Sequence, residues 1–200
     1  MNVYTIVVGM LQTNCYLAVS GTDAVVIDPG AQGGKILKSI DNANLNVAYI
    51  MLTHGHFDHT RGLKEVRGAL QVPILVHEKE ADFMKLKAAE RARYETGLKT
   101  PAFLELREGD EISFGTGRLK TLHTPGHTPG GACFLAAEEN VCFTGDTLFN
   151  DGVGRTDFPG GDARALADSI RSKLMTLPGE IKIYPGHGPS STIGRERKYF

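Results

Sequence analysis

A histidine-rich segment that directly follows an apolar strand is the strongest constraint on how this chain folds. Val47–Leu52 has the short, continuously apolar pattern of a buried β-strand. It runs into a segment with four metal-ligand side chains in six residues, Thr53-His54-Gly55-His56-Phe57-Asp58-His59. Alternate side chains of an extended backbone point the same way, so His54 and His56 can reach one ion. If the chain then turns, Asp58 and His59 can face a second ion beside the first.

Three further candidate ligands follow other expected strands, each beside a glycine. His127 lies in a loop stiffened by two prolines, Thr124-Pro125-Gly126-His127-Thr128-Pro129-Gly130. Asp146 lies in Thr144-Gly145-Asp146-Thr147, and His187 in Pro185-Gly186-His187-Gly188. Functional side chains are commonly carried on loops that a rigid sheet holds in place. The spacing therefore predicts that residues far apart in the chain form one metal centre.

The remainder of the chain alternates short apolar strands with amphipathic helices. The other expected strands are Val3–Val8, Cys15–Val19, Ala24–Ile27, Pro73–Val76, Glu111–Phe114, Leu119–His123, Ala132–Ala136, Val141–Thr144 and, as the last one, Ile181–Tyr184. The expected helices are Lys35–Asn42, Thr60–Leu70, Glu78–Tyr94 and, as the final one, Ala163–Leu177; a long loop, Asn150–Asp162, precedes the last of these. No linker divides the pattern, so we expect a single α/β domain over residues 1–200, with two packed sheets covered by helices.

Charge and cysteine usage narrow the partners and the compartment. Lysines and arginines number 22 against 23 aspartates and glutamates, so no global field favours nucleic acid or an anionic membrane. A small molecule is the expected partner, and the chain is expected to be a monomer or a homodimer. The start of the chain lacks an export signal and no stretch has transmembrane length, which predicts a cytoplasmic protein. The three cysteines are expected to be buried free thiols: Cys15, Cys133 and Cys142.

The full ligand pattern resembles the metallo-β-lactamase superfamily and, within it, the short glyoxalase II-like (hydroxyacylglutathione hydrolase-like) hydrolases. The resemblance runs from Val25-Val26-Ile27-Asp28-Pro29-Gly30 to Pro185-Gly186-His187-Gly188-Pro189. It implies an αββα four-layer sandwich with the metal site at one edge of the two sheets. It also implies two divalent metal ions, for which zinc is the first expectation and iron or manganese the alternatives.

Carried over residue by residue, the resemblance gives each ligand a role. The first metal would be held by His54, His56 and His127, the second by Asp58, His59 and His187, and Asp146 would bridge them. Asp28 would lie beneath the metals and orient their ligands; the alternative for Asp28 is a turn carboxylate before Pro29. His77 and His123 are expected to be ordinary packing or surface histidines.

The chemistry implied is hydrolysis of a carbonyl compound, with a thioester such as an S-acylglutathione as the first expectation. A bridging water would become hydroxide near neutral pH and attack the carbonyl, while Asp58 orients it or accepts its proton. Full-length glyoxalase II enzymes add a helical C-terminal domain that binds glutathione, which is not expected here. They also carry Lys and Tyr where this chain has Gly154-Arg155-Thr156-Asp157-Phe158. Arg155 could grip a substrate carboxylate or pair locally with Asp151 or Asp157.

Two rival functions remain open. The segment from Gly154 to Phe158 also resembles the persulfide dioxygenases of the same superfamily, which use a single iron. A lactone or ester hydrolase would use the same nucleophile as a thioesterase. Hydrolysis of β-lactams is less favoured, because those enzymes do not use a bridging carboxylate in the way that the position of Asp146 implies.

Overall fold

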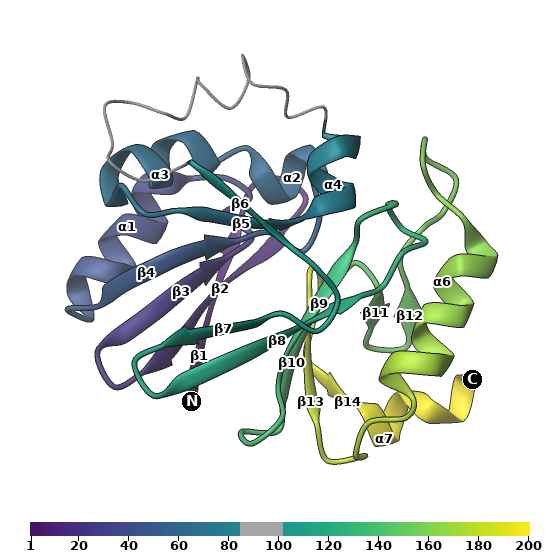
Figure 1. Ribbon diagram of the computed structural model, residues 1–200. Coiled ribbons are helices and arrows are strands. Elements are labelled where there is room, and N and C mark those ends of the chain that lie inside the picture. The colour runs from purple at the N-terminus through teal and green to yellow at the C-terminus, as the bar shows by residue number, and fades with distance from the viewer. Residues whose placement is uncertain (85–101) are drawn as a thin grey trace.

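Two six-stranded sheets face each other in the computed structural model, which describes residues 1–84 and 102–200 (Figure 1). The first sheet has the order β1-β2-β3-β4-β5-β6, namely β1 (Asn2–Val8), β2 (Thr13–Ser20), β3 (Asp23–Ile27), β4 (Asn46–Met51), β5 (Ile74–His77) and β6 (Phe103–Leu106). The second has the order β14-β13-β10-β9-β8-β7, namely β7 (Glu111–Phe114), β8 (Gly117–His123), β9 (Ala132–Ala136), β10 (Val141–Gly145), β13 (Lys182–Pro185) and β14 (Ser191–Thr192). A separate small hairpin is formed by β11 (Leu148–Phe149) and β12 (Gly152–Val153).

Helices cover the outer face of each sheet, which confirms the expected αββα sandwich (Figure 1). The first sheet is covered by α1 (Gly33–Asn42), α2 (Phe57–Thr60), α3 (Leu63–Leu70) and α4 (Glu78–Phe83). The second is covered by α6 (Ala163–Ser169), its π-helical continuation η1 (Ile170–Leu174), α7 (Ile193–Glu196) and the short 3-10 helix η2 (Arg197–Tyr199). No helix in the part of the chain that the structure describes is long and apolar enough to cross a membrane.

Three hydrophobic cores explain why the central strands are apolar on both faces. In β3, Val26 packs outward against the helices α1 and α3, whereas Val25 and Ile27 pack inward between the sheets. In β10, Cys142 packs outward beside α6 and Phe143 inward. A strand buried on both faces reads as a continuous apolar run in the sequence. The three cysteines lie on such strands and are free and buried, as expected.

Most strands lie where the sequence places them, but several elements differ. Strand β6 was not expected. The helix expected over Thr60–Leu70 begins only at Leu63, as α3, and Thr60 is the last residue of the separate helix α2. Between the two helices, Gly62 donates its N–H to Pro29 O over 2.9 Å. Of the expected helix Glu78–Tyr94, residues 78–83 form α4, and residues 85–94 lie outside the described residues.

The C-terminal part of the chain holds more regular structure than expected. The loop expected over Asn150–Asp162 contains strand β12, which pairs with β11. The helix expected over Ala163–Leu177 becomes π-helical at Ile170. Ile181–Tyr184 is not the last strand, since β14 pairs with β13 beyond it, and Ala163–Leu177 is not the final helix, since α7 follows.

Backbone hydrogen bonds join the two sheets at the edge where the candidate ligands lie. Asn14 N–H, in β2, donates to Gly186 O over 2.7 Å, and Ala132 N–H, in β9, donates to Thr53 O over 2.9 Å. Both acceptors are next to candidate ligands in the sequence. The two halves of the chain are therefore held in register at the place where they must meet.

Candidate metal centre

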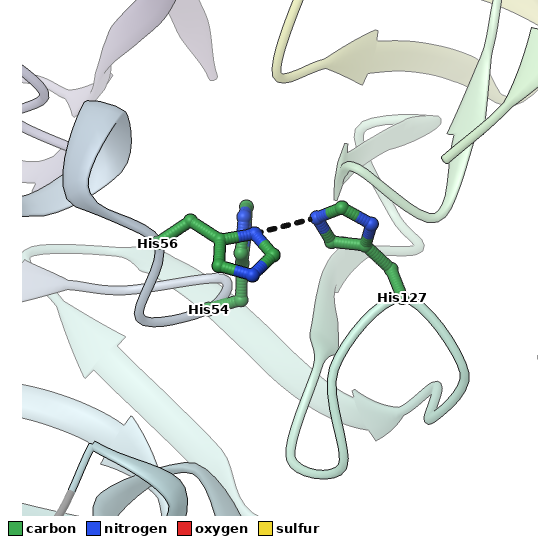
Figure 2. Close-up of side chains that lie close together, drawn as sticks. All are labelled: His54, His56 and His127. Carbon is green, nitrogen blue, oxygen red and sulfur yellow. Dashed lines mark hydrogen bonds between the residues drawn. The ribbon is translucent and has the colours of Figure 1, made fainter. Parts of the chain in front are cut away.

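The seven predicted ligands converge at one edge of the sandwich. The first sheet contributes those that follow β4, and the second contributes those that follow β8, β10 and β13: His54, His56, Asp58 and His59 from the first, and His127, Asp146 and His187 from the second. Figure 2 shows His54 and His56 reaching from one side towards His127 on the other. The convergence that the sequence predicted is thus present in the structure.

The first group of donors consists of His54, His56 and His127, whose ligand atoms all lie within 4.8 Å of one another. His56 Nδ1 lies 2.8 Å from His127 Nε2 (Figure 2). Two imidazole nitrogens attract each other at this distance only when one carries a proton, because otherwise two lone pairs meet. A cation placed between the rings would satisfy both lone pairs.

The second group consists of Asp58, His59 and His187, again with ligand atoms within 4.8 Å of one another. Asp58 Oδ2 lies 3.2 Å from His187 Nε2 and 3.6 Å from His59 Nε2. Thr13 Oγ1 donates a hydrogen bond to the same carboxylate oxygen over 3.2 Å. One carboxylate and two imidazoles form a donor set typical of zinc or iron sites.

Asp146 lies between the two groups. Its Oδ1 is 3.4 Å from His59 Nε2, and its Oδ2 is 3.6 Å from His127 Nε2 and 3.7 Å from His187 Nε2. One carboxylate thus reaches donors of both groups. This is the arrangement that a bridging ligand requires.

Hydrogen bonds on the far side of the rings orient four of the histidines. In each case Nδ1 bonds to the protein: His54 to Thr53 Oγ1 (3.1 Å), His59 to Asp28 Oδ2 (2.9 Å), His127 to Arg155 O (2.7 Å) and His187 to Leu11 O (3.1 Å). Metal-binding histidines characteristically use their second nitrogen in this way, which fixes the tautomer and the ring orientation. The Nε2 atom of each ring is left for a cation.

Three buried polar atoms of the centre make no hydrogen bond with any described residue: His54 Nε2, His59 Nε2 and Asp146 Oδ1. Buried polar groups in native proteins are almost always paired. Unpaired atoms that converge from two segments far apart in the chain fit a site built for a cation. The donor set therefore fits the two divalent ions that the sequence implied.

Asp28 connects the turn after β3 to this centre. Its Oδ1 accepts from Thr53 N–H (2.8 Å), and its Oδ2 accepts from Thr53 Oγ1 (2.6 Å) and lies against His59 Nδ1. The Asp28 backbone has a φ of +51°, a left-handed conformation that is unfavourable for most residues other than glycine. Although Asp28 also lies within 4.8 Å of His54 and His59 donors, its engaged carboxylate places it behind the His59 ring.

Burial and neighbouring charges give the donors opposite protonation preferences. Burial, with help from the neighbouring imidazoles, lowers the pKa of His54, and burial lowers the pKa of His56 to about 4. For His59, burial alone would lower the pKa, but Asp146 and Asp28 outweigh it and raise the pKa. Burial would raise the pKa of Asp58, but its hydrogen bond with His187 prevails and lowers it to about 2. His54, His56 and Asp58 therefore favour the forms that bind metal, which are the neutral imidazole and the ionised carboxylate.

Glu80 is a site residue that the sequence did not reveal. It is fully buried on α4, and its Oε1 accepts from Gly55 N–H (2.7 Å) while Oε2 accepts from Thr128 Oγ1 (2.8 Å) and Gly130 N–H (2.9 Å). One carboxylate thus joins the segment of His54 and His56 to the loop of His127. In the sequence, Glu80 is one acidic residue among several in a charged helix, and only the fold shows that it is buried.

A cleft of about 760 Å³ opens onto the centre. Its floor contains candidate ligands, and its walls are mainly apolar: Leu11, His56, Phe57, Asp58, Phe83, His127, Asp146, Phe149, Val153, Arg155, Phe158, Pro159 and His187 line it. Arg155 forms the local ion pair with Asp157, through Nε–Oδ1 at 2.7 Å and Nη2–Oδ2 at 2.6 Å. Contact of Arg155 with a substrate stays a prediction.

His77 and His123 lie away from the cleft and stack on each other, with ring centroids 4.0 Å apart and planes 6° apart. His77 Nδ1 accepts from Lys79 N–H at the start of α4, and His123 Nε2 lies 3.0 Å from Pro129 O. Both contacts are structural, in keeping with the packing role expected for this pair.

Comparison with known proteins agrees with this centre. The model of the metallo-β-lactamase superfamily matches residues 8–187. The chain belongs to this superfamily. Among relatives of the superfamily, it is 37% identical to the hydroxyacylglutathione hydrolase GloC of Haemophilus influenzae, over 99% of this chain and 96% of that protein.

Two solved superfamily structures are similar along nearly the whole chain. The B3 metallo-β-lactamase BLEG-1 has a TM-score of 0.87 and 33% identity, over 98% of this chain and 97% of that one. The di-iron-bound form of TTHA1623 has a TM-score of 0.82 and 36% identity, over 96% of each chain. The superfamily supports an enzyme with a metal centre, and one of these neighbours holds two irons.

Proposed function

We propose that this protein is a two-metal hydrolase that cleaves a small thioester, of which an S-acylglutathione is one example. The observation that carries the proposal is the position of Asp146, whose two oxygens reach donors of both three-residue groups within 3.4–3.7 Å. A centre for a single ion has no need of a carboxylate between two complete donor sets. The finer thioesterase assignment is supported by the similarity to GloC over nearly the full length of both chains.

The residues that would hold the ions follow from the two groups. The first ion would be held by His54, His56 and His127, the second by Asp58, His59 and His187, and Asp146 would contact both. When bound, such ions lower the pKa of a coordinated water and polarise a carbonyl oxygen. Zinc is the first candidate; iron is supported by the di-iron form of TTHA1623.

Asp58 is the candidate proton acceptor. It lines the cleft, and its carboxylate, whose pKa is lowered to about 2, is ionised at neutral pH. One of its oxygens accepts from Thr13 Oγ1, which fixes the rotamer. An ionised carboxylate at the edge of the cleft can orient an attacking water and take up its proton. A thiolate leaves readily, so cleavage of a thioester needs little help from an acid.

Two other reactions remain alternatives. A lactone or ester would be attacked in the same manner and would differ only in its leaving group. Oxidation of a persulfide by molecular oxygen at a single-iron site would use fewer of the donors. It is supported by the likeness of the segment from Gly154 to Phe158 to the persulfide dioxygenases. Part of that segment forms a wall of the cleft, through Arg155 and Phe158.

Metal analysis combined with turnover tests the proposal. The purified protein is expected to hold two metal equivalents and to hydrolyse S-lactoylglutathione, and His56→Ala is expected to lose at least ~100-fold in kcat/KM. His123→Asn, which removes a histidine outside the centre, serves as the matched control and should keep both metal and turnover. Equal turnover by wild type and His56→Ala rejects the mechanism. One iron per chain with rapid oxygen uptake on glutathione persulfide favours the dioxygenase, and turnover of a chromogenic cephalosporin alone favours a β-lactamase.

A further inference from the structure

We infer that the cleft beside the metal centre selects substrates whose acyl group is apolar and uncharged, an inference that rests on the proposed hydrolase function. The first observation concerns exposed apolar side chains. Phe57 is 65% exposed, Leu11 54%, Phe158 43% and Val153 42%, and all four line this one cleft. Scattered exposed apolar residues are normal, but a concave group around a reactive centre is typical of a binding site.

Aromatic rings stand directly against candidate ligands on both sides of the centre. The ring centroids of Phe158 and Phe83 lie 5.7 Å and 6.4 Å from that of His56, and both rings meet it edge to face. On the other side, the Phe149 ring lies 6.2 Å from the His187 ring. If a carbonyl carbon is held at the centre, the groups attached to it therefore have apolar rings nearby on both sides. An acyl group that extends to either side of the centre can therefore contact one of these rings.

The walls of the cleft provide little positive charge to hold an anionic acyl group. Arg155 is the only lysine or arginine that lines it within the described part of the chain. Its guanidinium is engaged edge-on by Asp157 through two hydrogen bonds, and its carbon Cζ lies 3.9 Å above the centre of the Phe158 ring. The Nε–Nη2 edge of the guanidinium, one of the two edges that can bind a carboxylate, is therefore occupied by Asp157. On the floor, Asp58 and Asp146 would offset part of the positive charge of two bound divalent ions.

Geometry and charge together specify the chemical class. The cleft, at about 760 Å³, lies within the usual range for small-molecule sites. Covering CH₂ groups or an aromatic ring with these walls is favourable, and the described residues of the walls offer a carboxylate no lysine or arginine other than the paired Arg155. The expected preference is for aliphatic or aromatic acyl groups over short hydroxylated ones such as lactoyl.

A series of thioesters that differ only in the acyl chain tests the preference. With acetyl, butanoyl, hexanoyl and lactoyl groups on one and the same thiol, kcat/KM should rise about two- to fourfold per added methylene, as for partly to fully buried CH₂ groups. Lactoyl should fall below butanoyl. A kcat/KM that is flat across the series, or highest for lactoyl, overturns the inference.

Variants locate the effect in the cleft. Phe158→Ala and Phe57→Ala remove exposed rings, so folding should be retained, and each should reduce the increment per methylene. Tyr4→Ala is the matched control, because Tyr4 is an aromatic residue of β1 that is 52% exposed and does not line the cleft. The inference is contradicted if kcat/KM still rises with each methylene by the wild-type factor in both phenylalanine variants. It is also contradicted if this factor falls equally in Tyr4→Ala.

Binding of reaction products separates this inference from the hydrolase proposal. Acetate, butanoate and hexanoate can be titrated into the metal-loaded protein by calorimetry, without any turnover. Affinity that rises with chain length while no thioester is cleaved contradicts the hydrolase but supports an apolar acyl site. Cleavage of thioesters with no dependence on chain length supports the hydrolase and overturns the apolar acyl site.

Discussion

Asp28 Oδ2 lies 2.9 Å from Nδ1 of His59, and the same carboxylate also binds the backbone and the hydroxyl of Thr53. These bonds retain Asp28 in its left-handed conformation, with φ +51°, and they turn His59 Nε2 towards Asp146. The turn after β3 therefore sets the direction of a candidate ligand that lies 31 residues away in sequence.

Asp28→Asn should weaken metal binding without unfolding the protein. An amide is uncharged and has one acceptor oxygen, so it cannot keep all three bonds and also favour the correct His59 tautomer. Removal of such an orienting partner typically weakens metal affinity by about 10–100-fold, which competition with a chelator would measure. Asp41→Asn, at an exposed position in α1, is the control. An unchanged affinity in Asp28→Asn would show that His59 is oriented by other contacts.

Glu80→Gln should act on the first group of donors more than on the second. Both oxygens of Glu80 accept hydrogen bonds, whereas glutamine has one oxygen and one NH₂ group. The NH₂ group would face either the Gly55 N–H or the two donors of Thr128 and Gly130, so donors would meet donors. A buried unsatisfied polar group costs about 1–3 kcal/mol, so the free energy of unfolding in urea should fall by that amount. One of the two metal equivalents should also bind more weakly than the other.

The matched control is Glu78→Gln, on the same helix, whose carboxylate makes an exposed ion pair with Arg107. Exposed pairs contribute at most about 1 kcal/mol. Equal weakening of both metal equivalents in Glu80→Gln would contradict a specific link between Glu80 and the first group.

Gly186→Ala should disrupt the centre through steric overlap alone. A Cβ at Gly186 would overlap Asp146 Oδ1 and would come within 2.6 Å of His59 Cε1. Elemental analysis is expected to find less than one metal per chain. Gly68→Ala is the contrasting substitution, since a Cβ there has no neighbour within 4 Å and Gly68 lies inside α3; it should stabilise the protein by about 0.5–1 kcal/mol. Full metal content in Gly186→Ala would show that the backbone can shift enough to remove the overlap, and it would contradict the prediction.

The stacked pair of His77 and His123 should make stability depend on pH. Burial, followed by the influence of His123, lowers the pKa of His77 to about 4. Between pH 6.5 and 4 the unfolded chain therefore binds a proton that the folded protein excludes, so the free energy of unfolding falls as the pH falls. Between pH 7 and 5, the free energy of unfolding should fall by about 1–2 kcal/mol more in the wild type than in His77→Asn.

Urea unfolding at the two pH values measures this difference. Asparagine is a good N-cap and can replace the Nδ1 acceptor at the start of α4. Other charged groups near the pair are Glu78, Lys79, Glu108 and Lys173, and all of them remain in the variant. Equal losses in the two proteins would exclude His77 as the source.

The sequence predicted the strands best where burial on both faces made them continuously apolar, as in β3 and β10. Strand β6 was missed because it has only four residues and its two central ones, Leu104 and Glu105, are both exposed, which leaves no alternating burial pattern. The break between α2 and α3 depends on a contact between Gly62 and Pro29, which no local pattern encodes. Tertiary contacts thus account for the differences in element boundaries.

The candidate ligands could be predicted because each is a histidine or an aspartate that closely follows a strand. Glu80 and the apolar cleft could not, since their roles depend on which segments come together. The rings of Phe83, Phe149 and Phe158 belong to three separate elements or loops, and no spacing in the chain relates them. Arg155 shows the same limit, because its pairing with Asp157 is a matter of local rotamers.

The division of the donors between the two sheets has a consequence for synthesis of the chain. Four donors lie at residues 54–59, but the others come at residues 127, 146 and 187. A nascent chain on the ribosome therefore exposes four donors long before their counterparts exist, and it cannot assemble either three-residue group at that stage. The first group is complete only after residue 127 has left the ribosome, and the second only after residue 187 has left it. The two complete donor sets are therefore a property of the folded protein and not of the emerging polypeptide.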